Sequence, residues 1–328
     1  MILDGSLPAS VDQGARTLAA GELVAFPTET VYGLGADAGS DAAVAKIFAA
    51  KGRPSDHPLI VHVADAGSVP HFAASVPPFA QRLMDAFWPG PLTLILPRRA
   101  GVGTAAAGGQ ASIGLRCPAH PVAHALLLAC RAASPPVAGV AGPSANKFGR
   151  VSPTTAQHVQ SEFGDGLLVL DGGPCGVGIE STIIDCTRGA PVLLRPGVLT
   201  AAAIEQACGQ RLADPGTDSP RASGTLESHY APRARVRLMD ARALQTALDL
   251  LGAEAAQIAT WSRVILRSSS DKILRRRMPD DAIETARQLF AVLRDFDAQG
   301  VRLIWVETPP PTPEWDGVRD RLQRASAG

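Results

Sequence analysis

Short apolar runs alternate with longer segments of helical spacing along the first two thirds of the chain, and proline, glycine or a polar residue ends most of them. Apolar runs of four to eight residues predict buried strands, and a period of three to four predicts helices. The expected strands are 22–26, 59–61, 92–96, 112–117, 136–140, 167–170, 176–185 and 191–195; the expected helices are 11–20, 41–50, 77–87, 121–131 and 200–208. This alternation favours an α/β sheet covered by helices.

A second pattern begins after a stretch rich in Asp, Pro, Gly, Ser and Thr at residues 213–232, which has the composition of a linker. Beyond it we expect a small α/β layer with strands 235–239, 257–261, 263–267 and 301–306 and helices 240–252, 280–298 and 315–325. The predicted organisation is therefore a domain at 1–212, a linker or lid at 213–233 and a smaller domain at 234–328.

The amino-acid composition of the chain narrows the classes of function that we expect. The chain has 328 residues, of which 46% are hydrophobic, and its 31 Lys and Arg balance 31 Asp and Glu. A neutral chain is not expected to grip nucleic acid over a broad surface, although a local basic groove remains open. The five cysteines show no metal-ligand spacing, and no apolar run is long enough to span a bilayer, so we expect free thiols in a cytoplasmic protein. These cysteines are at positions 117, 130, 175, 186 and 208.

Residues Lys51 to His62 carry the most suggestive cluster of charge. Lys51 and Arg53 precede one proline, His57 precedes a second, and a residue before proline is biased away from helix. The two prolines should stiffen a turn that presents positive charge to a polyanion such as a triphosphate. A solvated basic turn is the competing interpretation.

Two loops combine small residues with short polar side chains. In Pro27–Gly35, two threonine hydroxyls and the Glu29 carboxylate precede two glycines, a composition that lets a small ligand approach the backbone. A plain strand-to-helix connection would use the same residues as turn and cap. In Ala141–Pro153, Ser144, Asn146 and Ser152 supply hydrogen-bonding groups before a helix that Thr154 or Thr155 should cap.

Two predicted strands end on an arginine, Arg116 and Arg195, each followed by a turn. An arginine in this position suits a bidentate contact with a carboxylate, although a surface arginine has the same pattern. Trp88 could stack on a ligand, but a tryptophan before Pro-Gly-Pro more often anchors a core. The run Arg275–Arg277 is more typical of a solvated face than of an RNA contact.

Taken together, these stretches resemble the YrdC-like family, in its two-domain L-threonylcarbamoyladenylate synthase form. The resemblance covers roughly residues 8–232, and its signature is a Lys-x-Arg pair followed by Ser-x-Asn. The matching segments, in family order, are Pro27–Gly35, Lys51–His62, Trp88–Thr93, Gly114–Arg116, Pro143–Asn146, Gly176–Thr182, Leu194–Gly197 and Ser228–Pro232. The region after them resembles the small Rossmann-like appendage of that family.

The resemblance implies a twisted, open, mixed sheet with helices and a nucleotidyltransferase that joins L-threonine, bicarbonate and ATP with Mg²⁺. The metal would be held by phosphates rather than by protein side chains. The implied catalytic set is Lys51, Arg53, Ser144 and Asn146. The implied threonine site is Thr30, His62, Arg116, Gly142 and Ser181. The implied ATP site is Arg53, His57, Ser112, Ser144, Ser152, Arg195 and Tyr230.

Two positions depart from some family members, since His57 replaces asparagine and Gly142 replaces alanine. The product would pass to the machinery that adds threonylcarbamoyl groups to tRNA, and the resemblance allows a weak contact with tRNA. A binding module for double-stranded RNA or tRNA without catalysis is the alternative. A third interpretation keeps the fold but changes the acceptor, as in carbamoyl-transferring relatives that mature hydrogenases.

Overall fold

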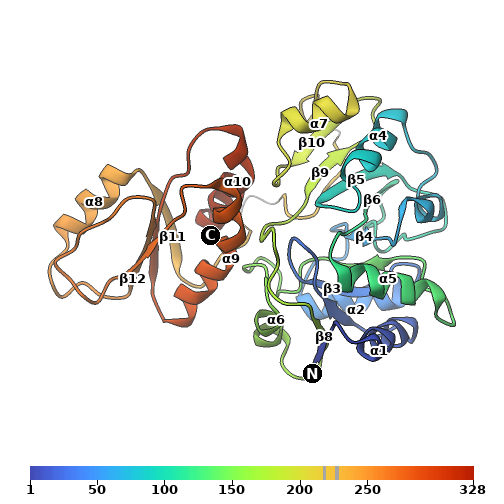
Figure 1. Cartoon of the computed structure of the whole chain (residues 1–328), viewed down its shortest axis with the longest axis horizontal. Coiled ribbons are helices and arrows are strands. Elements are labelled where there is room, and N and C mark those ends of the chain that lie inside the picture. The colour runs from blue at the N-terminus through green and yellow to red at the C-terminus, as the bar shows by residue number, and fades with distance from the viewer. Residues whose placement is uncertain (217–218, 226–228) are drawn as a thin grey trace. The chain divides into compact units, whose positions relative to one another are not determined.

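The computed structural model describes residues 1–216, 219–225 and 229–328, which form two compact units (Figure 1). The first unit comprises Met1–Phe148 and Ser152–Thr225, and the second comprises Gly149–Val151 and the described residues from His229 onward. Part of the expected linker or lid, residues 217–218 and 226–228 with Ser228 of the Ser228–Pro232 segment, lies outside the described residues.

The first unit is built on a ten-stranded sheet in the order β1-β8-β2-β3-β7-β4-β6-β5-β9-β10. Parallel and antiparallel pairs both occur, so the mixed α/β class expected from sequence is confirmed. Its strands are β1 (Ile2–Asp4), β2 (Val24–Phe26), β3 (Gly33–Asp37), β4 (Ile60–His62), β5 (Leu92–Pro97), β6 (Ser112–Arg116), β7 (Val140–Ala141), β8 (Leu168–Asp171), β9 (Thr182–Asp185) and β10 (Val192–Arg195).

Helices pack on both faces of this sheet, at the places where the strands present apolar side chains. Helices α1 and α5 share one apolar cluster with β2 and β8, and α2 and α4 share another with β4, β5 and β6 on the opposite face. The helices are α1 (Pro8–Ala19), α2 (Asp41–Lys51), α3 (Val69–Phe72), α4 (Pro78–Phe87), α5 (Pro121–Ala132), α6 (Ala156–Phe163) and α7 (Ala201–Cys208), with a 3₁₀ turn at Ala66–Ser68.

Strand alternation leaves part of one face without a helix. Val61, Leu94 and Leu115 point into the cluster with α2 and α4. Because successive strand residues point to opposite faces, Ile60, Ile95 and Gly114 point the other way. These three are register partners across β4, β6 and β5, and they line a hollow instead of a core.

Local signals explain where α2 begins and ends. The Ser40 side chain accepts a hydrogen bond from the backbone N–H of Ala43, and Gly52 adopts the left-handed conformation that ends the helix. Lys51 is therefore the last helical residue, and Arg53 follows the turn. Thr155 caps α6 in the same way, as predicted.

Several predicted elements differ from the structure. Of the run 136–140, only Val140 lies in a strand, the two-residue β7. The run 176–185 forms a strand only from Thr182, and Gly178 before it has a φ of 82°. Strands β1 and β3 and helix α3 were not predicted, since β1 has only three residues, β3 has glycine or alanine at three of its five positions, and α3 is a single turn. Trp88 packs against the core and donates its indole N–H to the Leu92 carbonyl at 2.8 Å.

The second unit holds a parallel sheet in the order β11-β14-β12-β13, which agrees with the Rossmann-like layer expected. The predicted strand 263–267 is wrong: the chain there forms a loop, and the edge strand is β13, which carries the arginine run. All three arginines are exposed, and Arg276 and Arg277 form ion pairs with Asp295 and Asp280. The elements are β11 (Arg235–Met239), α8 (Ala241–Leu250), β12 (Ile258–Ser262), β13 (Leu274–Arg277), α9 (Ala282–Ala298), β14 (Leu303–Glu307), a 3₁₀ turn (Pro313–Trp315) and α10 (Asp316–Ser326).

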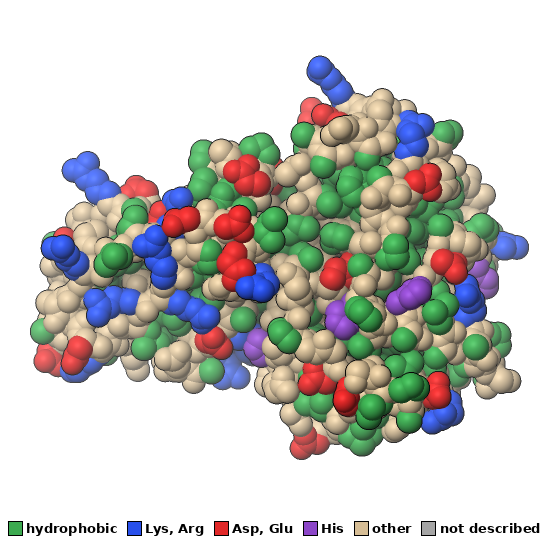
Figure 2. All heavy atoms as spheres, viewed as in Figure 1, with side chains coloured by type: hydrophobic (Ala, Val, Ile, Leu, Met, Phe, Trp, Pro, Cys, Tyr) green, Lys and Arg blue, Asp and Glu red, His purple; other side chains and the backbone are tan. Residues whose placement is uncertain are grey.

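Two sequence expectations about chemistry can be compared with the structure. All five cysteines are free and buried. Among the described residues, no helix combines the length and the apolar character that crossing a membrane requires. Figure 2 shows acidic and basic side chains interspersed over the face drawn, rather than a continuous basic surface.

Gly139 tests how tightly the first unit is packed. A Cβ at this buried position would lie 2.7 Å from Phe72 Cε2 and 2.9 Å from Val61 Cγ1. We expect Gly139→Ala to lower the free energy of unfolding by about 1–3 kcal/mol through overpacking. Chemical denaturation measures this, and adding Phe72→Leu should make the pair less destabilising than the sum of the single changes by about 1 kcal/mol.

Gly176→Ala is the matched control, because no atom lies within 4 Å of its added Cβ. Its effect should stay within about 0.5 kcal/mol. Additive effects of Gly139→Ala and Phe72→Leu would contradict the proposed clash.

Candidate active site

Most of the polar residues singled out in the sequence lie at one end of the central strands of the sheet. His62 ends β4 and Arg116 ends β6, and the two are register partners. They follow the register partners Ile60 and Gly114 by two residues, so they lie on the same face as the hollow. Two residues along a strand span roughly 6.6 Å. The histidine and arginine therefore flank the hollow at its edge.

Arg116 is held in place by three neighbours. Its Nη1 donates to the Thr30 hydroxyl at 2.8 Å, its Nε donates to the Gly90 carbonyl at 3.3 Å, and its Nη2 lies 2.7 Å from Glu29 Oε1. The arginine side chain is only 4% exposed. A buried, oriented guanidinium of this kind can bind a ligand carboxylate.

His62 is a neutral hydrogen-bond acceptor beside Arg116. Burial, and then the charge of Arg116, lower the pKa of His62 to about 3, and its Nδ1 has no hydrogen-bond partner among the described residues. A Cβ at Gly142 would lie 2.9 Å from that nitrogen. Glycine at 142 therefore keeps open the space in front of His62.

Lys51 binds the loop that carries Ser144 and Asn146. Its ammonium donates to the Ser144 carbonyl at 2.6 Å and also to the Asn146 carbonyl. The Phe148 N–H donates to the Lys51 carbonyl at 2.9 Å. Burial, with Arg53 as the next cause, holds the pKa of Lys51 well below its usual value. The signature residues are thus joined, with lysine acting on the loop backbone.

Arg53 and His57 both contact the ring of Phe148, which belongs to the loop that carries Ser144 and Asn146. The Arg53 guanidinium carbon lies 5.6 Å from the Phe148 ring centroid, and His57 meets that ring edge-on at 5.5 Å. Arg53 Nη2 also donates to the Pro58 carbonyl at 3.1 Å. Burial, followed by the charge of Arg53, lowers the pKa of His57.

Arg195 and Ser181 lie behind two residues that line the hollow, since Arg195 contacts Ser223 and Ser181 contacts Thr93. Arg195 donates from Nε and Nη2 to the Ser181 carbonyl, at 3.1 and 2.9 Å, and from Nη2 to the Ser181 hydroxyl at 3.2 Å. That hydroxyl also lies 2.8 Å from the Thr93 hydroxyl. Ser152 donates to Glu180 at 2.5 Å. Ser181 therefore contacts the nucleotide side of the predicted site as well as its expected threonine side.

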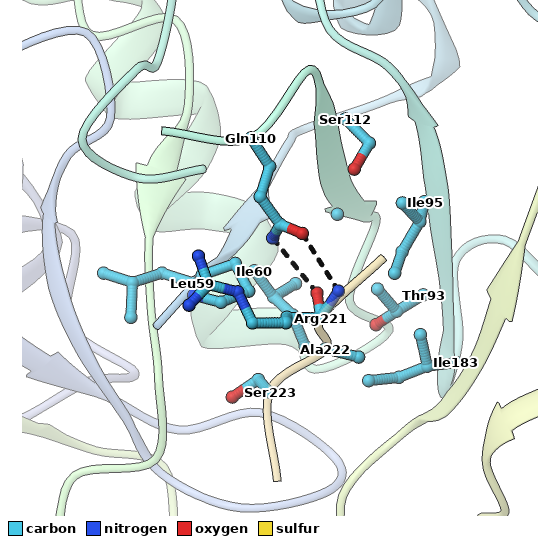
Figure 3. Close-up of a pocket in the computed structure, with 12 residues that line it drawn as sticks. Leu59, Ile60, Thr93, Ile95, Gln110, Ser112, Ile183, Arg221, Ala222 and Ser223 are labelled. Atoms are coloured by element: carbon cyan, nitrogen blue, oxygen red, sulfur yellow. Dashed lines mark hydrogen bonds between the residues drawn. The ribbon is translucent and has the colours of Figure 1, made fainter. Parts of the chain in front are cut away.

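Three residues of the linker, Arg221, Ala222 and Ser223, line the hollow (Figure 3). The Gln110 side chain exchanges two hydrogen bonds with the Arg221 backbone, at 3.2 and 2.9 Å. Ser223 then contacts both arginines: its carbonyl accepts from Arg195 Nη1 at 2.7 Å, and its hydroxyl lies 3.5 Å from Arg53 Nη2. Ser112 lines the same hollow. Ser223 thus places two neutral oxygens against both cations.

Tyr230 belongs to the second unit. Its φ is 62°, a left-handed value that few non-glycine residues adopt. Its ring lies 5.4 Å from the Arg321 guanidinium carbon and 5.4 Å from the Phe290 ring centroid. The other predicted site residues all belong to the first unit.

Sequence reasoning missed four contributors to this site: Thr93, Gln110, Glu180 and Ser223. Glu29 was noted as a loop carboxylate but was not assigned to the site. The available sequence signal was its position between Thr28 and Thr30. In the structure these two hydroxyls contact each other, and the Thr30 hydroxyl also accepts a hydrogen bond from Arg116. No sequence signal marked Gln110 or Ser223, since their roles depend on segments distant along the chain.

The fold and these contacts define a class: a two-unit α/β protein in which a cationic hollow adjoins a buried arginine and a neutral histidine. Family models agree with it. A model described as "Telomere recombination" matches residues 16–197, and one described as "Threonylcarbamoyl-AMP synthase, C-terminal domain" matches residues 199–327. The chain belongs to the threonylcarbamoyl-AMP synthase family.

Individual relatives agree along nearly the whole chain. The threonylcarbamoyl-AMP synthase of Pyrococcus abyssi is 40% identical over 93% of this chain and 91% of the relative, and that of Bacillus subtilis is 38% identical over 97% and 93%. The crystal structure of P. abyssi Sua5 complexed with L-threonine has a TM-score of 0.88 at 36% identity, covering 98% of this chain and 95% of that one. Escherichia coli YciO, at 22% identity and a TM-score of 0.51, shares the fold.

His62 predicts a pH dependence of stability. The unfolded histidine takes up a proton near pH 6.5, whereas the folded one resists until about pH 3. The stabilisation is complete above pH 6.5 and is lost as pH falls toward 3, at up to about 1.4 kcal/mol per pH unit. We expect His62→Gln to lose less stability than the parent protein between pH 6.5 and 5 in denaturant titrations.

His57 and His120 also have lowered pKa values, but they are present in both proteins and cancel in the comparison. Parallel stability curves for the two proteins would show that His62 does not carry this effect.

Proposed function

We propose that this chain joins L-threonine, carbon dioxide from bicarbonate, and ATP into L-threonylcarbamoyl-AMP with release of pyrophosphate. The observation that carries the proposal is the position of Ser223, whose two oxygens contact Arg53 and Arg195 in a hollow adjoining Arg116 and His62. Two arginines that reach the same residue are suited to the phosphates of a nucleotide. The names of the relatives and the threonine-bound neighbour support the same substrates.

The chemistry requires neutralisation of charge more than a covalent nucleophile. The threonine ammonium first loses a proton, which bicarbonate takes up as it becomes carbon dioxide and water. The amine then adds to carbon dioxide and releases a second proton to solvent, which leaves a carbamate. A carbamate oxygen then attacks the α-phosphorus of ATP, the bond from that phosphorus to the bridging oxygen breaks, and pyrophosphate leaves. Each of these phosphate groups is an anion, so fixed cations stabilise the transition state.

The residues of this chain can be given roles in that sequence. Arg116 binds the threonine carboxylate, and His62 accepts a hydrogen bond from the amino acid. Arg53 and Arg195 bind the phosphates, while Lys51 keeps Ser144 and Asn146 in place through their carbonyls. Ser112 and Gly114 lie on the floor of the hollow, where a side chain larger than glycine would reduce the space for a nucleotide.

Mg²⁺ enters this proposal as part of the ATP substrate. No group of three or more His, Cys, Asp or Glu suited to a metal occurs among the described residues. Phosphate and water oxygens are normal Mg²⁺ ligands in nucleotide sites, and such a site needs few protein ligands.

The product would pass to the enzymes that attach the threonylcarbamoyl group to tRNA. The alternative, a module that only binds double-stranded RNA or tRNA, is less well supported, because the relatives carry enzyme names and the chain has a formal net charge of zero. A steep salt dependence of RNA affinity without binding of ATP or threonine would favour that alternative.

Threonine-dependent exchange of labelled pyrophosphate into ATP, in the presence of bicarbonate and Mg²⁺, tests the proposed function. We expect Arg53→Ala to lose about 2–4 kcal/mol of transition-state stabilisation, or roughly 10²- to 10³-fold in rate. Arg131→Ala is the matched control, because that arginine is 51% exposed and pairs only with a surface aspartate. Equal exchange by both variants, or no exchange by the parent protein, would reject the proposal.

We infer in addition that residues 213–232 act as a lid over the reacting groups, with Tyr230 closing over the nucleotide. The contacts of Ser223 support movement of this segment, because Ser223 occupies donors of Arg53 and Arg195 that phosphates would use. A labile carbamate and adenylate need a site closed to water.

The lid predicts that a chain ending at residue 212 loses most of its adenylate synthesis while it still binds threonine. The measurement is product formation alongside threonine calorimetry on the same preparation, with thermal denaturation as a check of folding. Synthesis at the full rate by the shortened chain would remove the lid from the mechanism.

A further inference from the structure

Arg116 shares its buried position with a single acidic neighbour among the described residues within ion-pair distance, Glu29. Glu29 Oε1 lies 2.7 Å from Arg116 Nη2, and the two side chains are 14% and 4% exposed. The charges of the pair cancel, so the end of the site next to His62 is close to neutral before any ligand arrives. On the nucleotide side, Arg53 and Arg195 both contact oxygens of Ser223.

The backbone around Glu29 fixes its carboxylate. Oε2 accepts a hydrogen bond from the Ala119 N–H at 3.1 Å, in a contact that is open to solvent, and the Glu29 carbonyl accepts one from the Val177 N–H at 2.7 Å. The adjacent Thr30 hydroxyl is bound by Arg116. Each carboxylate oxygen can accept more than one hydrogen bond, so Glu29 keeps the capacity to accept another from a ligand.

A neutral Arg–Glu pair and a lone arginine should select different ligands. A lone buried arginine favours any small carboxylate. Beside a fixed carboxylate, however, an anionic ligand meets repulsion as well as attraction, whereas a zwitterion brings an ammonium that offsets it. Free amino acids are zwitterions at neutral pH, and hydroxy acids of the same shape are anions.

We propose that Glu29 makes this position selective for zwitterions: Arg116 binds the α-carboxylate, and Glu29 accepts a hydrogen bond from the α-ammonium. This inference rests on the proposed function, because it takes Arg116 as the carboxylate ligand. Glu29 thereby becomes a residue that determines specificity, and the selection acts on the amino group that must later form the carbamate.

The charge arrangement also gives the reaction a direction within the site. When the ammonium loses its proton and captures carbon dioxide, the ligand gains a second negative charge. The Glu29 carboxylate repels that charge, whereas Arg53 and Arg195, which both contact Ser223, lie on the nucleotide side of the site. The carbamate is therefore favoured on the side where the α-phosphorus would lie.

Binding measurements on the full chain test the proposal, with L-threonine and 3-hydroxybutyrate as ligands. The latter keeps the carboxylate and hydroxyl of threonine and lacks the amine. For the parent protein, calorimetry should give a lower Kd for threonine than for 3-hydroxybutyrate. In Glu29→Gln, the Kd for threonine should rise about 10- to 100-fold, and the Kd for 3-hydroxybutyrate should stay the same or fall.

The opposite response of the two ligands is the decisive readout. A purely structural role, in which Glu29 only holds Arg116, would weaken both ligands to the same extent, and that outcome overturns the proposal. Unchanged binding of both ligands overturns it as well. Glu29→Asp keeps the charge and should keep the preference for threonine, and the exposed Glu22→Gln is the matched control, expected to change neither Kd.

Two further results separate this proposal from the one on which it rests. If the parent protein binds threonine and catalyses exchange but Glu29→Gln loses both ligands equally, only the role of Glu29 fails. If the parent protein binds no threonine, both proposals fail. Should Glu29→Gln not fold, equal affinity of the parent protein for the two ligands would still reject the selection of zwitterions.

Discussion

The alternation of side chains along β4, β6 and β5 is the constraint on which this site depends. One set of alternate residues, which includes Val61, Leu94 and Leu115, is buried under α2 and α4. That burial fixes the register, because a slip by one residue would expose the whole set. The other set of alternate residues therefore points to the opposite face, where Ile60, Gly114 and Ile95 line a hollow. His62 and Arg116 follow in the same register at its edge.

Lys51 and Arg195 are buried, and both donate to backbone carbonyls. Lys51 donates to the loop of Ser144 and Asn146, and Arg195 donates to Ser181 and Ser223. Carbonyl oxygens are neutral acceptors, so these hydrogen bonds satisfy the donors without an ion pair. Arg116 differs because Glu29 neutralises it.

The linker residues Arg221 and Ser223 lie where the proposed reaction would place a nucleotide. Gln110 holds the Arg221 backbone, and Ser223 occupies the two arginines. The Gln110 contacts join neutral groups, whereas those of Ser223 join neutral oxygens to cations, and phosphate oxygens can replace the latter with stronger charge-assisted hydrogen bonds. The hollow is thus satisfied in the free protein and still suited to exchange Ser223 for a nucleotide.

The sequence by itself determined the alternation of strands and helices, the second α/β unit and the family, because apolar periodicity and short ordered motifs are local properties. It also marked Lys51, Arg53, Arg116, Ser144 and Arg195. It misplaced the strand at 263–267 and overlooked β3, since pairing with distant strands outweighed local composition there. Only the tertiary structure decided that Lys51 acts on a loop backbone, that Glu29 neutralises Arg116 and that Ser223 lies between two arginines. Each of these facts joins segments far apart in the chain, and no local pattern encodes which groups will meet when a sheet brings them to one edge.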